Sequence, residues 1–220
     1  MPEFRLLAFD MDGVLVDSSA CHARAFSELW SRLRIDGPEY DQIAGRRTGD
    51  VIQEFAAPLG PSQARLRAWT RWKQERAREL LGSEPIRFDD SEAALRSLAR
   101  AGLRMALGSG ASRATVDLVL RRFGWTELFS PVVSAEDVAR GKPAPDVYRL
   151  LLERSRVEPS DALVVEDSAA GIEAGLACGA HVVSVRSGLS SPSPRFLGSC
   201  ADLAELARRL TSEASHPCRA

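Results

Sequence analysis

The sequence has no run of apolar residues that approaches the ~18 needed to cross a membrane as a helix. It also has no excess of charge, because 29 basic and 30 acidic side chains leave a formal net charge of −1. This balance gives no electrostatic reason to expect binding to nucleic acid or to acidic membranes. The segment MPEFRLLAFD at the N-terminus lacks the layout of a signal peptide. We therefore expect a cytoplasmic globular protein that binds neither nucleic acid nor membrane.

The sequence is also poor in cysteine and in lysine. Its four cysteines lie far apart without a CxxC pair, so we expect reduced thiols and no cysteine-based metal site. Of the 29 basic side chains, only Lys73 and Lys142 are lysines. Arginine serves equally well at most surface positions, and each of these two lysines is therefore a candidate for a specific role.

Short apolar segments alternate with amphipathic segments along most of the chain. The predicted strands are Leu6–Phe9, Met105–Leu107, Pro131–Ser134, Leu163–Val165 and His181–Val185. The predicted helices are Ser91–Ala101, Ser112–Phe123, Pro145–Arg154, Ser168–Cys178 and Asp202–Leu210. Strands separated by helices of about 10–15 residues are typical of βαβ units. The pattern predicts an α/β fold with a parallel sheet covered by helices on both faces.

One long segment, 18–84, interrupts this alternation. It is far too long for an ordinary connection, and its apolar residues have the spacing of helices. We therefore predict a helical cap at 18–84, inserted into a catalytic core formed by 1–17 and 85–212. The last residues, 213–220, are polar and are expected to form a disordered tail.

Two helices are predicted within the insertion. The apolar residues of Phe26–Leu33 follow the i, i+3, i+4, i+7 spacing, after a possible N-cap at Ser18 or Ser19. A second helix is predicted at Ser62–Leu81, with Gly82 as its C-terminal stop.

Two pairs of acids follow predicted strands. Asp10 and Asp12 follow the first strand at positions i and i+2, which places both side chains on one side if the strand continues. Glu166 and Asp167 follow the fourth strand. Carboxylates held together repel unless a cation lies between them, and oxygen ligands suit Mg²⁺. Each pair alone has an ordinary alternative: acids in a loop with Gly13 as a turn residue, or an N-cap for the helix that follows.

Two loops have the features of phosphate-binding segments. Gly108–Ser112 joins a strand to a helix with small residues, so its N–H groups and the Ser109 hydroxyl could contact a phosphate. In Gly141–Asp146, Pro143 restricts the backbone beside Lys142, whose ammonium group could neutralise a phosphate. A common connector and a solvated lysine are the alternatives.

Together, these four signals resemble, in order and spacing, the motifs of the haloacid dehalogenase-like hydrolase superfamily. The chain is similar to the branch that contains β-phosphoglucomutase and the sugar-phosphate and phosphoglycolate phosphatases. FDMDGVLVDS resembles the first motif, Ser109 the second, GKPAPDVY the third and VVEDSAAGIEAG the fourth. The resemblance implies a Rossmann-like core with an α-helical cap after the first strand.

The resemblance also implies the catalytic roles. Asp10 would attack phosphorus and become an aspartyl phosphate. Asp12 would protonate the leaving oxygen and then deprotonate the attacking water, while Ser109 and Lys142 would hold the phosphoryl group. Haloacid dehalogenases and phosphonoacetaldehyde hydrolases lack an aspartate at the position of Asp12, which argues against both activities.

By the same resemblance, Mg²⁺ is the expected cofactor. Its ligands would be Asp10, the backbone carbonyl of Asp12 and Asp167, with Glu166 in the outer shell.

Several further residues are candidates for substrate binding. Gly110 follows Ser109 where relatives often place Asn or Ser, so one side-chain contact is missing. In the cap, His22 and Lys73 match by position residues of related enzymes. Arg46 and Arg47 lie in a loop that resembles the family's substrate-facing loop and would suit a second anionic group. The alternatives are a histidine of the hinge helix, a solvated lysine and an exposed basic loop.

We therefore predict an enzyme, a Mg²⁺-dependent phosphatase acting on a small phosphorylated metabolite of the sugar-phosphate or phosphoglycolate type, as a monomer or a dimer. The first alternative is a phosphomutase, which returns the phosphoryl group to a bound intermediate. The second is a non-catalytic binding module, which would be expected to have lost Asp10 or Asp12.

Overall fold

A six-stranded sheet lies at the centre of the computed structural model, which describes residues 4–213. Neighbouring strands are parallel and follow the order β3-β2-β1-β4-β5-β6. The strands are β1 (Leu6–Phe9), β2 (Met105–Gly108), β3 (Val132–Val133), β4 (Ala162–Glu166), β5 (His181–Val185) and β6 (Phe196–Cys200). Parallel neighbours need a crossover connection, and helices make most of these crossovers here.

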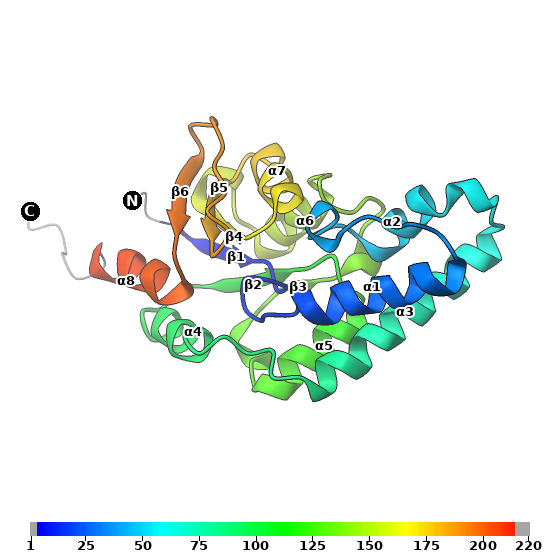
Figure 1. Ribbon diagram of the computed structural model, residues 1–220. Helices are drawn as coiled ribbons and strands as arrows, with labels where there is room; N and C mark the ends of the chain where they lie inside the picture. Colours follow the sequence, from blue (N-terminus) through cyan, green and yellow to red (C-terminus); the bar gives the residue numbers. More distant parts are fainter. Residues whose placement is uncertain (1–3, 214–220) are drawn as a thin grey trace, which may run out of the picture.

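Strand β1 shows why both faces of the sheet are covered. Successive side chains of a strand point to opposite faces, and Leu7 and Phe9 pack in one hydrophobic cluster while Leu6 and Ala8 pack in another. The core helices that contribute to the first cluster are α4 (Ser91–Arg100), α5 (Arg113–Phe123) and α8 (Leu203–Glu213), and the ends of two helices of the inserted segment 18–84 join it. Those of the second are α6 (Asp146–Ser155) and α7 (Ala169–Ala177). Figure 1 shows these two groups of helices on opposite sides of the strands.

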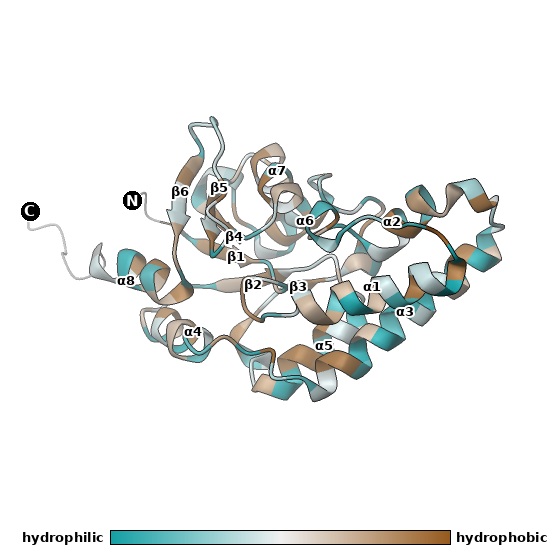
Figure 2. Ribbon diagram, viewed as in Figure 1, coloured by the Kyte–Doolittle hydropathy of each residue, from teal (hydrophilic) through white to brown (hydrophobic). Residues whose placement is uncertain are grey.

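Between β1 and α4 the chain forms a helical insertion, called the cap below. It contains α1 (Ser19–Leu33), α2 (Thr48–Phe55) and α3 (Gln63–Ser83), with 3₁₀ turns at Tyr40–Gln42 and Ala57–Leu59. Helices α1 and α3 lie side by side (Figure 1). The cap has its own apolar cluster, formed by Phe26, Leu29, Trp30, Ile43, Val51, Ile52, Ala56 and Leu66. Figure 2 shows hydrophilic residues along most of α3, in keeping with the few buried residues of this helix.

The predicted α/β class with an inserted helical cap is confirmed, but two elements were missed. Strand β6 lies at the edge of the sheet and is mostly half-buried, and its pairing with β5 is irregular, so it has no strong apolar pattern. Helix α2 has only eight residues, TGDVIQEF, and begins inside the segment interpreted as a loop. The helix is stabilised by the burial of Val51 and Ile52 in the cap. This tertiary contact cannot be read from the spacing of apolar residues in so short a segment.

Two predicted helix ends also differ. Gly82 does not stop α3, which continues to Ser83 and ends where Glu84 turns extended. Ser18 holds the N-cap position of α1, but its hydroxyl makes no capping bond and donates to Asp12 instead. The predicted tail, 213–220, lies outside the described residues except for Glu213, the last residue of α8.

Within residues 4–213 we find no helix whose length and hydropathy would let it span a bilayer.

Candidate active site

The predicted core residues meet at the carboxyl ends of neighbouring strands. Asp10 follows β1, Ser109 follows β2, and Glu166 ends β4 with Asp167 directly after it. In the sheet these strands are adjacent, in the order β2-β1-β4. Ligand sites of open α/β sheets lie at this edge. The loop before α6 brings Lys142 to the same place.

Lys142 joins two of the acids. Its Nζ donates hydrogen bonds to Asp10, to Glu166 Oε1 at 2.6 Å and to the Gly108 carbonyl at 3.1 Å. The side chain is almost completely buried. Burial works against its charge, but the charges of Asp10 and Glu166 outweigh that cost and raise the pKa of Lys142. The lysine is therefore a fixed positive charge next to the predicted nucleophile.

Glu166 is surrounded by hydrogen-bond donors. Its Oε1 accepts from Lys142 and from the Tyr148 hydroxyl, each at 2.6 Å. Its Oε2 accepts from the Ser168 hydroxyl and from the Asp167 N–H, each at 3.1 Å. Both oxygens are already engaged, which suits a carboxylate that orients the site more than one that binds a metal directly. The N-cap given above as the ordinary alternative is also present, at Ser168, whose Oγ accepts from a helix N–H.

Three carboxylates are close enough to hold a metal ion. Asp10, Glu166 and Asp167 each offer an oxygen, and these oxygens lie within 4.8 Å of one another. Burial and the neighbouring negative charges raise the pKa of Asp10 well above its usual value, although Lys142 opposes the shift. Burial and the charge of Glu166 raise the pKa of Asp167 to about 8. A hard divalent cation such as Mg²⁺ would relieve this repulsion, so the donor set fits the predicted cofactor.

Gly13 leaves the space that Asp167 occupies. Its φ is +82°, and a Cβ built there would lie 1.9 Å from Asp167 Oδ2. Only glycine combines this left-handed backbone with so close an approach. Gly13, the turn residue after Asp12, therefore determines how closely Asp167 can approach this loop.

On the cap side, Asp12 is held by residues of α1. Its Oδ1 accepts from the Ser18 hydroxyl at 2.6 Å and lies 3.3 Å from His22 Nε2. Lys73 Nζ lies 2.9 Å from His22 Nδ1. A protonated lysine can only donate, so Nδ1 accepts, and the proton on Nε2 points to Asp12. Burial opposes the ionisation of Asp12, but the charge and hydrogen bond of His22 and the Ser18 bond lower its pKa.

Lys73 is buried, and no carboxylate of residues 4–213 is bonded to it. Its ammonium lies 4.0 Å from the centre of the Phe26 ring, a cation–π contact. Burial lowers the pKa of Lys73 to about 7. Burial and then the charge of Lys73 lower the pKa of His22.

Core and cap enclose a cavity of only about 30 Å³. This volume holds about two water molecules, so the space between core and cap is smaller than any phosphate ester in this conformation. Both Asp10 and Asp12 line the cavity, as their spacing predicted. The other lining residues are His22, Phe26, Tyr40, Ile43, Gly45, Arg46, Thr48, Lys73, Gly110 and Ala111.

The two predicted arginines have different positions. Arg46 lines the cavity, with its guanidinium paired to Glu54 at 2.5 Å. Arg47 is absent from the cavity wall. It pairs with Asp50 at 2.6 Å and donates across to the Val138 carbonyl of the core at 3.3 Å. In this conformation Arg47 therefore contacts the core and not the cavity.

The loop after β2 also meets the cap. Ser109 Oγ accepts from the Ala111 N–H at 3.0 Å, which leaves its own proton available for donation. A Cβ at Gly110 would lie 3.0 Å from the Gly45 carbonyl of the cap. The missing side chain at Gly110 thus allows the two backbones to approach.

The sequence patterns missed three polar residues of the site. Tyr148 has the spacing of a core residue of α6, and only its place in GKPAPDVY could have indicated it. Ser18 was interpreted as a helix cap. Tyr40 lies in a segment without a clear pattern, yet its ring stacks beside His22 with centroids 6.1 Å apart.

Comparisons with known proteins agree with this geometry. A family model for haloacid dehalogenase-like hydrolases matches residues 4–179. Hexitol phosphatase A from Escherichia coli is 34% identical over 189 residues, which cover 84% of this chain and 84% of that protein. Fructose-1-phosphate phosphatase YqaB from the same organism is 33% identical over 188 residues, covering 82% and 95%.

Solved structures have the same fold. One is a CbbY mutant from Rhodobacter sphaeroides in complex with xylulose-(1,5)bisphosphate, with a TM-score of 0.75 and 26% identity, covering 92% of this chain and 96% of that one. The predictions of this family and of an enzyme are both confirmed. The chain belongs to the haloacid dehalogenase-like hydrolases.

Proposed function

We propose that the protein is a phosphatase that hydrolyses small phosphate monoesters, of the sugar-phosphate or phosphoglycolate type, through a phosphorylated Asp10. The observation that carries this proposal is the pair Asp10 and Asp12, which line one cavity between core and cap. Asp10 bonds the fixed charge of Lys142, and Asp12 bonds Ser18 and His22. The relatives named as phosphatases of fructose 1-phosphate and of hexitol phosphates support the same reaction class.

In the first half of the reaction, an Asp10 oxygen forms a bond to phosphorus as the bond to the leaving oxygen breaks. Asp12 gives its proton to that leaving oxygen. Its low pKa applies to the site without phosphate, and a phosphoryl group beside it favours the protonated form. Lys142 and Ser109 neutralise and position the transferring group.

In the second half, Asp12 takes a proton from water, which attacks phosphorus and releases inorganic phosphate and the free carboxylate of Asp10. His22 and Ser18 keep the Asp12 side chain in place for both steps. The narrow space between core and cap leaves little room for other water.

Mg²⁺ fits the carboxylate cluster, and we propose Asp10, the backbone carbonyl of Asp12 and Asp167 as its ligands. Glu166 then belongs to the outer shell, because both of its oxygens accept hydrogen bonds from protein donors. The ion would supply positive charge that keeps Asp10 ionised and offsets the charge on the phosphoryl oxygens.

The residues proposed to contact the rest of the substrate are His22, Arg46 and Lys73 of the cap and Gly110 of the core, all of which line the cavity. Arg47 would reach a substrate only after its bonds to Asp50 and Val138 are broken.

The test is phosphate release from a panel of phosphorylated sugars, polyols and phosphoglycolate, with Mg²⁺ and with EDTA. We expect turnover only with the metal. The nearly isosteric Asp10→Asn should abolish turnover and keep the fold, and Asp12→Asn should cost about 10²–10⁴-fold in kcat. Turnover by Asp10→Asn, or equal rates in EDTA, would refute the mechanism. Isomerisation of β-glucose 1-phosphate with little phosphate release would favour the mutase.

A further inference from the structure

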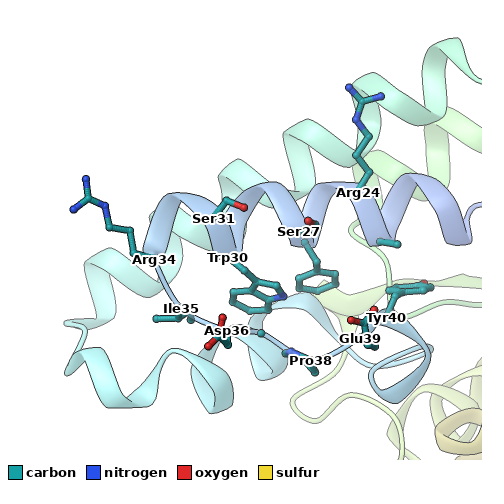
Figure 3. Close-up of a pocket in the computed structure, with 13 residues that line it drawn as sticks. Arg24, Ser27, Trp30, Ser31, Arg34, Ile35, Asp36, Pro38, Glu39 and Tyr40 are labelled. Carbon is teal, nitrogen blue, oxygen red and sulfur yellow. The ribbon is translucent and has the colours of Figure 1, made fainter.

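One aromatic residue of the cavity wall, Tyr40, has no role in the reaction described above. It lies at the end of the segment 34–40, which returns along α1 toward the core (Figure 3). Its side chain lines the catalytic cavity and, on its other side, the outer hollow drawn in Figure 3. The ring lies beside those of His22 and Phe26, with centroid distances of 6.1 Å and 6.5 Å. The ring contacts hold this side chain in place and leave its hydroxyl free to make a polar contact.

Most charged side chains of the cavity wall already have protein partners. The pairs are Asp10–Lys142, Asp12–His22, Lys73–His22 and Arg46–Glu54. Two hydroxyl groups of the wall, those of Tyr40 and Thr48, have no hydrogen-bond partner within residues 4–213. Neither oxygen is sealed inside the protein, because the buried polar atoms without a partner in the described chain belong to other residues. A ligand oxygen can therefore take the place of the water that such a hydroxyl would bind.

The charges of three acids of the site act on the Tyr40 hydroxyl. Burial, and then the negative charges of Asp12, Asp167 and Asp10, raise the pKa of Tyr40 well above its usual value. These acids lie on the catalytic side of the ring, so the hydroxyl faces the cavity and not the outer hollow. The raised pKa keeps the hydroxyl protonated, and a phenol both donates and accepts hydrogen bonds. It can therefore bond a neutral hydroxyl group in either direction, whereas an ammonium or guanidinium group can only donate.

The position of Tyr40 decides which oxygen of an ester it can meet. In the proposed reaction Asp12 contacts the leaving oxygen, and phosphorus lies beyond that oxygen, toward Asp10. Tyr40 lies on the cap side, where its ring is within 9° of parallel to that of His22, the residue bonded to Asp12. In a sugar or polyol phosphate, the next oxygen after the leaving oxygen is the hydroxyl of the second carbon. That hydroxyl is the first polar group of the ester on the side of Tyr40.

We propose that Tyr40 is a specificity-determining residue, whose hydroxyl binds the hydroxyl on the second carbon of a sugar or polyol phosphate held between core and cap. The proposal rests on the phosphatase function proposed above and narrows its substrates. Esters with a hydroxyl group beside the phosphate-bearing carbon are preferred over esters that lack it.

Removing one hydroxyl from the protein and one from the ester tests this contact. Glycerol 1-phosphate and 3-hydroxypropyl phosphate are matched esters, which differ only in the hydroxyl on the second carbon. Tyr40→Phe keeps the ring contacts with His22 and Phe26 and loses one oxygen. For glycerol 1-phosphate it should lower kcat/KM about tenfold, as expected for one hydrogen bond in a site shielded from water. For 3-hydroxypropyl phosphate the loss should be at least about fivefold smaller, since that ester has no hydroxyl to bind there.

Tyr148, the other of the two tyrosines in the sequence, provides the matched control. Its hydroxyl bonds Glu166 in the core half of the site. Tyr148→Phe therefore removes the same group from the phosphoryl end, and it should lower kcat/KM for the two esters by the same factor. A loss in Tyr40→Phe that was equal for the two esters, or no loss for either, would overturn the proposal.

Binding measured by calorimetry, with Mg²⁺ present, separates this proposal from the phosphatase function. In an Asp10→Asn background, which should leave both esters intact, Tyr40→Phe should weaken the binding of glycerol 1-phosphate about tenfold and that of 3-hydroxypropyl phosphate at least about fivefold less. This difference, with no phosphate released by the wild type from any ester, would overturn the phosphatase and support the contact. Release of phosphate by the wild type, with the same change in Tyr40→Phe for both esters, would overturn the contact and leave the phosphatase standing. Equal binding of the two esters, or binding of neither, would also overturn the contact.

Discussion

The core half and the cap half of the cavity are built from different interactions. On the core side, Asp10 and Glu166 are buried acids that share one buried lysine, Lys142. On the cap side, the buried lysine, Lys73, contacts a histidine and an aromatic ring, and no acid in the described part of the chain is bonded to it. The same scarce residue type thus has a raised pKa in one half and a lowered pKa in the other.

This difference indicates that the two halves of the cavity have different roles in substrate binding. In the proposed reaction, the core half would bind the phosphoryl group that all substrates share, and its charges are held by hydrogen bonds at the ends of several strands. The cap half is lined by rings and by groups whose charges depend on their surroundings, which suits contact with variable parts of a substrate. Substitutions in the core half should therefore affect all esters equally, and those in the cap half should discriminate between them.

The largest expected effect is that of Lys142→Arg. The guanidinium keeps the charge, but it is longer and planar, and the lysine Nζ already has three partners at short distance. Misplacing the charge by about 1 Å should cost on the order of 10²-fold in kcat/KM, to a similar extent for every ester. Steady-state kinetics on several esters measures this, with circular dichroism as the control for folding. Full activity in this variant would remove Lys142 from the site.

The second prediction concerns Lys73→Met, which keeps the shape of the stem and removes the charge. Burial outweighs the attraction between Asp12 and the Lys73 ammonium, so removing this charge should stabilise the fold at pH 7 by about 1–4 kcal/mol. Activity should nevertheless fall, and more for some esters than for others. Such a gain in stability with a loss of activity is typical of a residue kept for function.

The pH dependence gives Lys73→Met a second readout. The pKa of Lys73 is about 7 in the folded chain against an ordinary value of 10.5, so the unfolded chain binds more protons between these values. Wild-type stability due to this group therefore rises with pH through that window. The advantage of Lys73→Met should be greatest at and below pH 7 and shrink toward pH 10.5. Chemical denaturation of both proteins across this range measures it, and a constant difference would contradict the lowered pKa.

The core half could largely be predicted from the sequence, because its charged residues directly follow apolar strands, where charged side chains are uncommon. Asp10 and Glu166 each follow a strongly apolar strand, which indicates a function for these acids. Lys142, one of only two lysines, lies in a proline-rich loop. Tyr148 could not be found this way, since a buried aromatic on α6 has the pattern of an ordinary core residue.

The cap half was harder to predict for physical reasons. Its contacts depend on how α1, α2 and the returning segment pack, and α2 itself is too short for a clear pattern. Adjacent arginines look equivalent in a sequence, but one turns into the cavity and the other toward the core. Tyr40 carries no local signal because its neighbours His22 and Phe26 come from α1.

The third prediction tests the tight packing of the core half. In Gly171→Ala, the new Cβ would lie 1.8 Å from Glu166 Oε1, and Glu166 accepts five hydrogen bonds. We expect a loss of about 1–3 kcal/mol in the free energy of unfolding, with activity reduced for all esters. Gly82→Ala is the matched control, because Gly82 is also helical and a Cβ there meets nothing within 4 Å. It should stabilise the fold by up to about 1 kcal/mol. Equal effects of the two substitutions would mean that Glu166 moves freely.

The smallest expected effect separates the two arginines of the cap. Arg47 joins the cap to the core through Val138, so Arg47→Gln should weaken closure without removing a group from the cavity. We expect kcat/KM to fall about two- to fivefold for every ester, with less than about 1 kcal/mol lost in unfolding, because the Arg47 side chain is partly exposed. Arg46→Gln is the contrast, since Arg46 lines the cavity and its loss should chiefly affect esters with a second anionic group. Kinetics on a monophosphate and a bisphosphate of the same sugar separates the two outcomes. If Arg47→Gln discriminated between these esters as Arg46→Gln does, both arginines would contact substrate in the working enzyme, and the bond to Val138 would belong only to the conformation without substrate contacts.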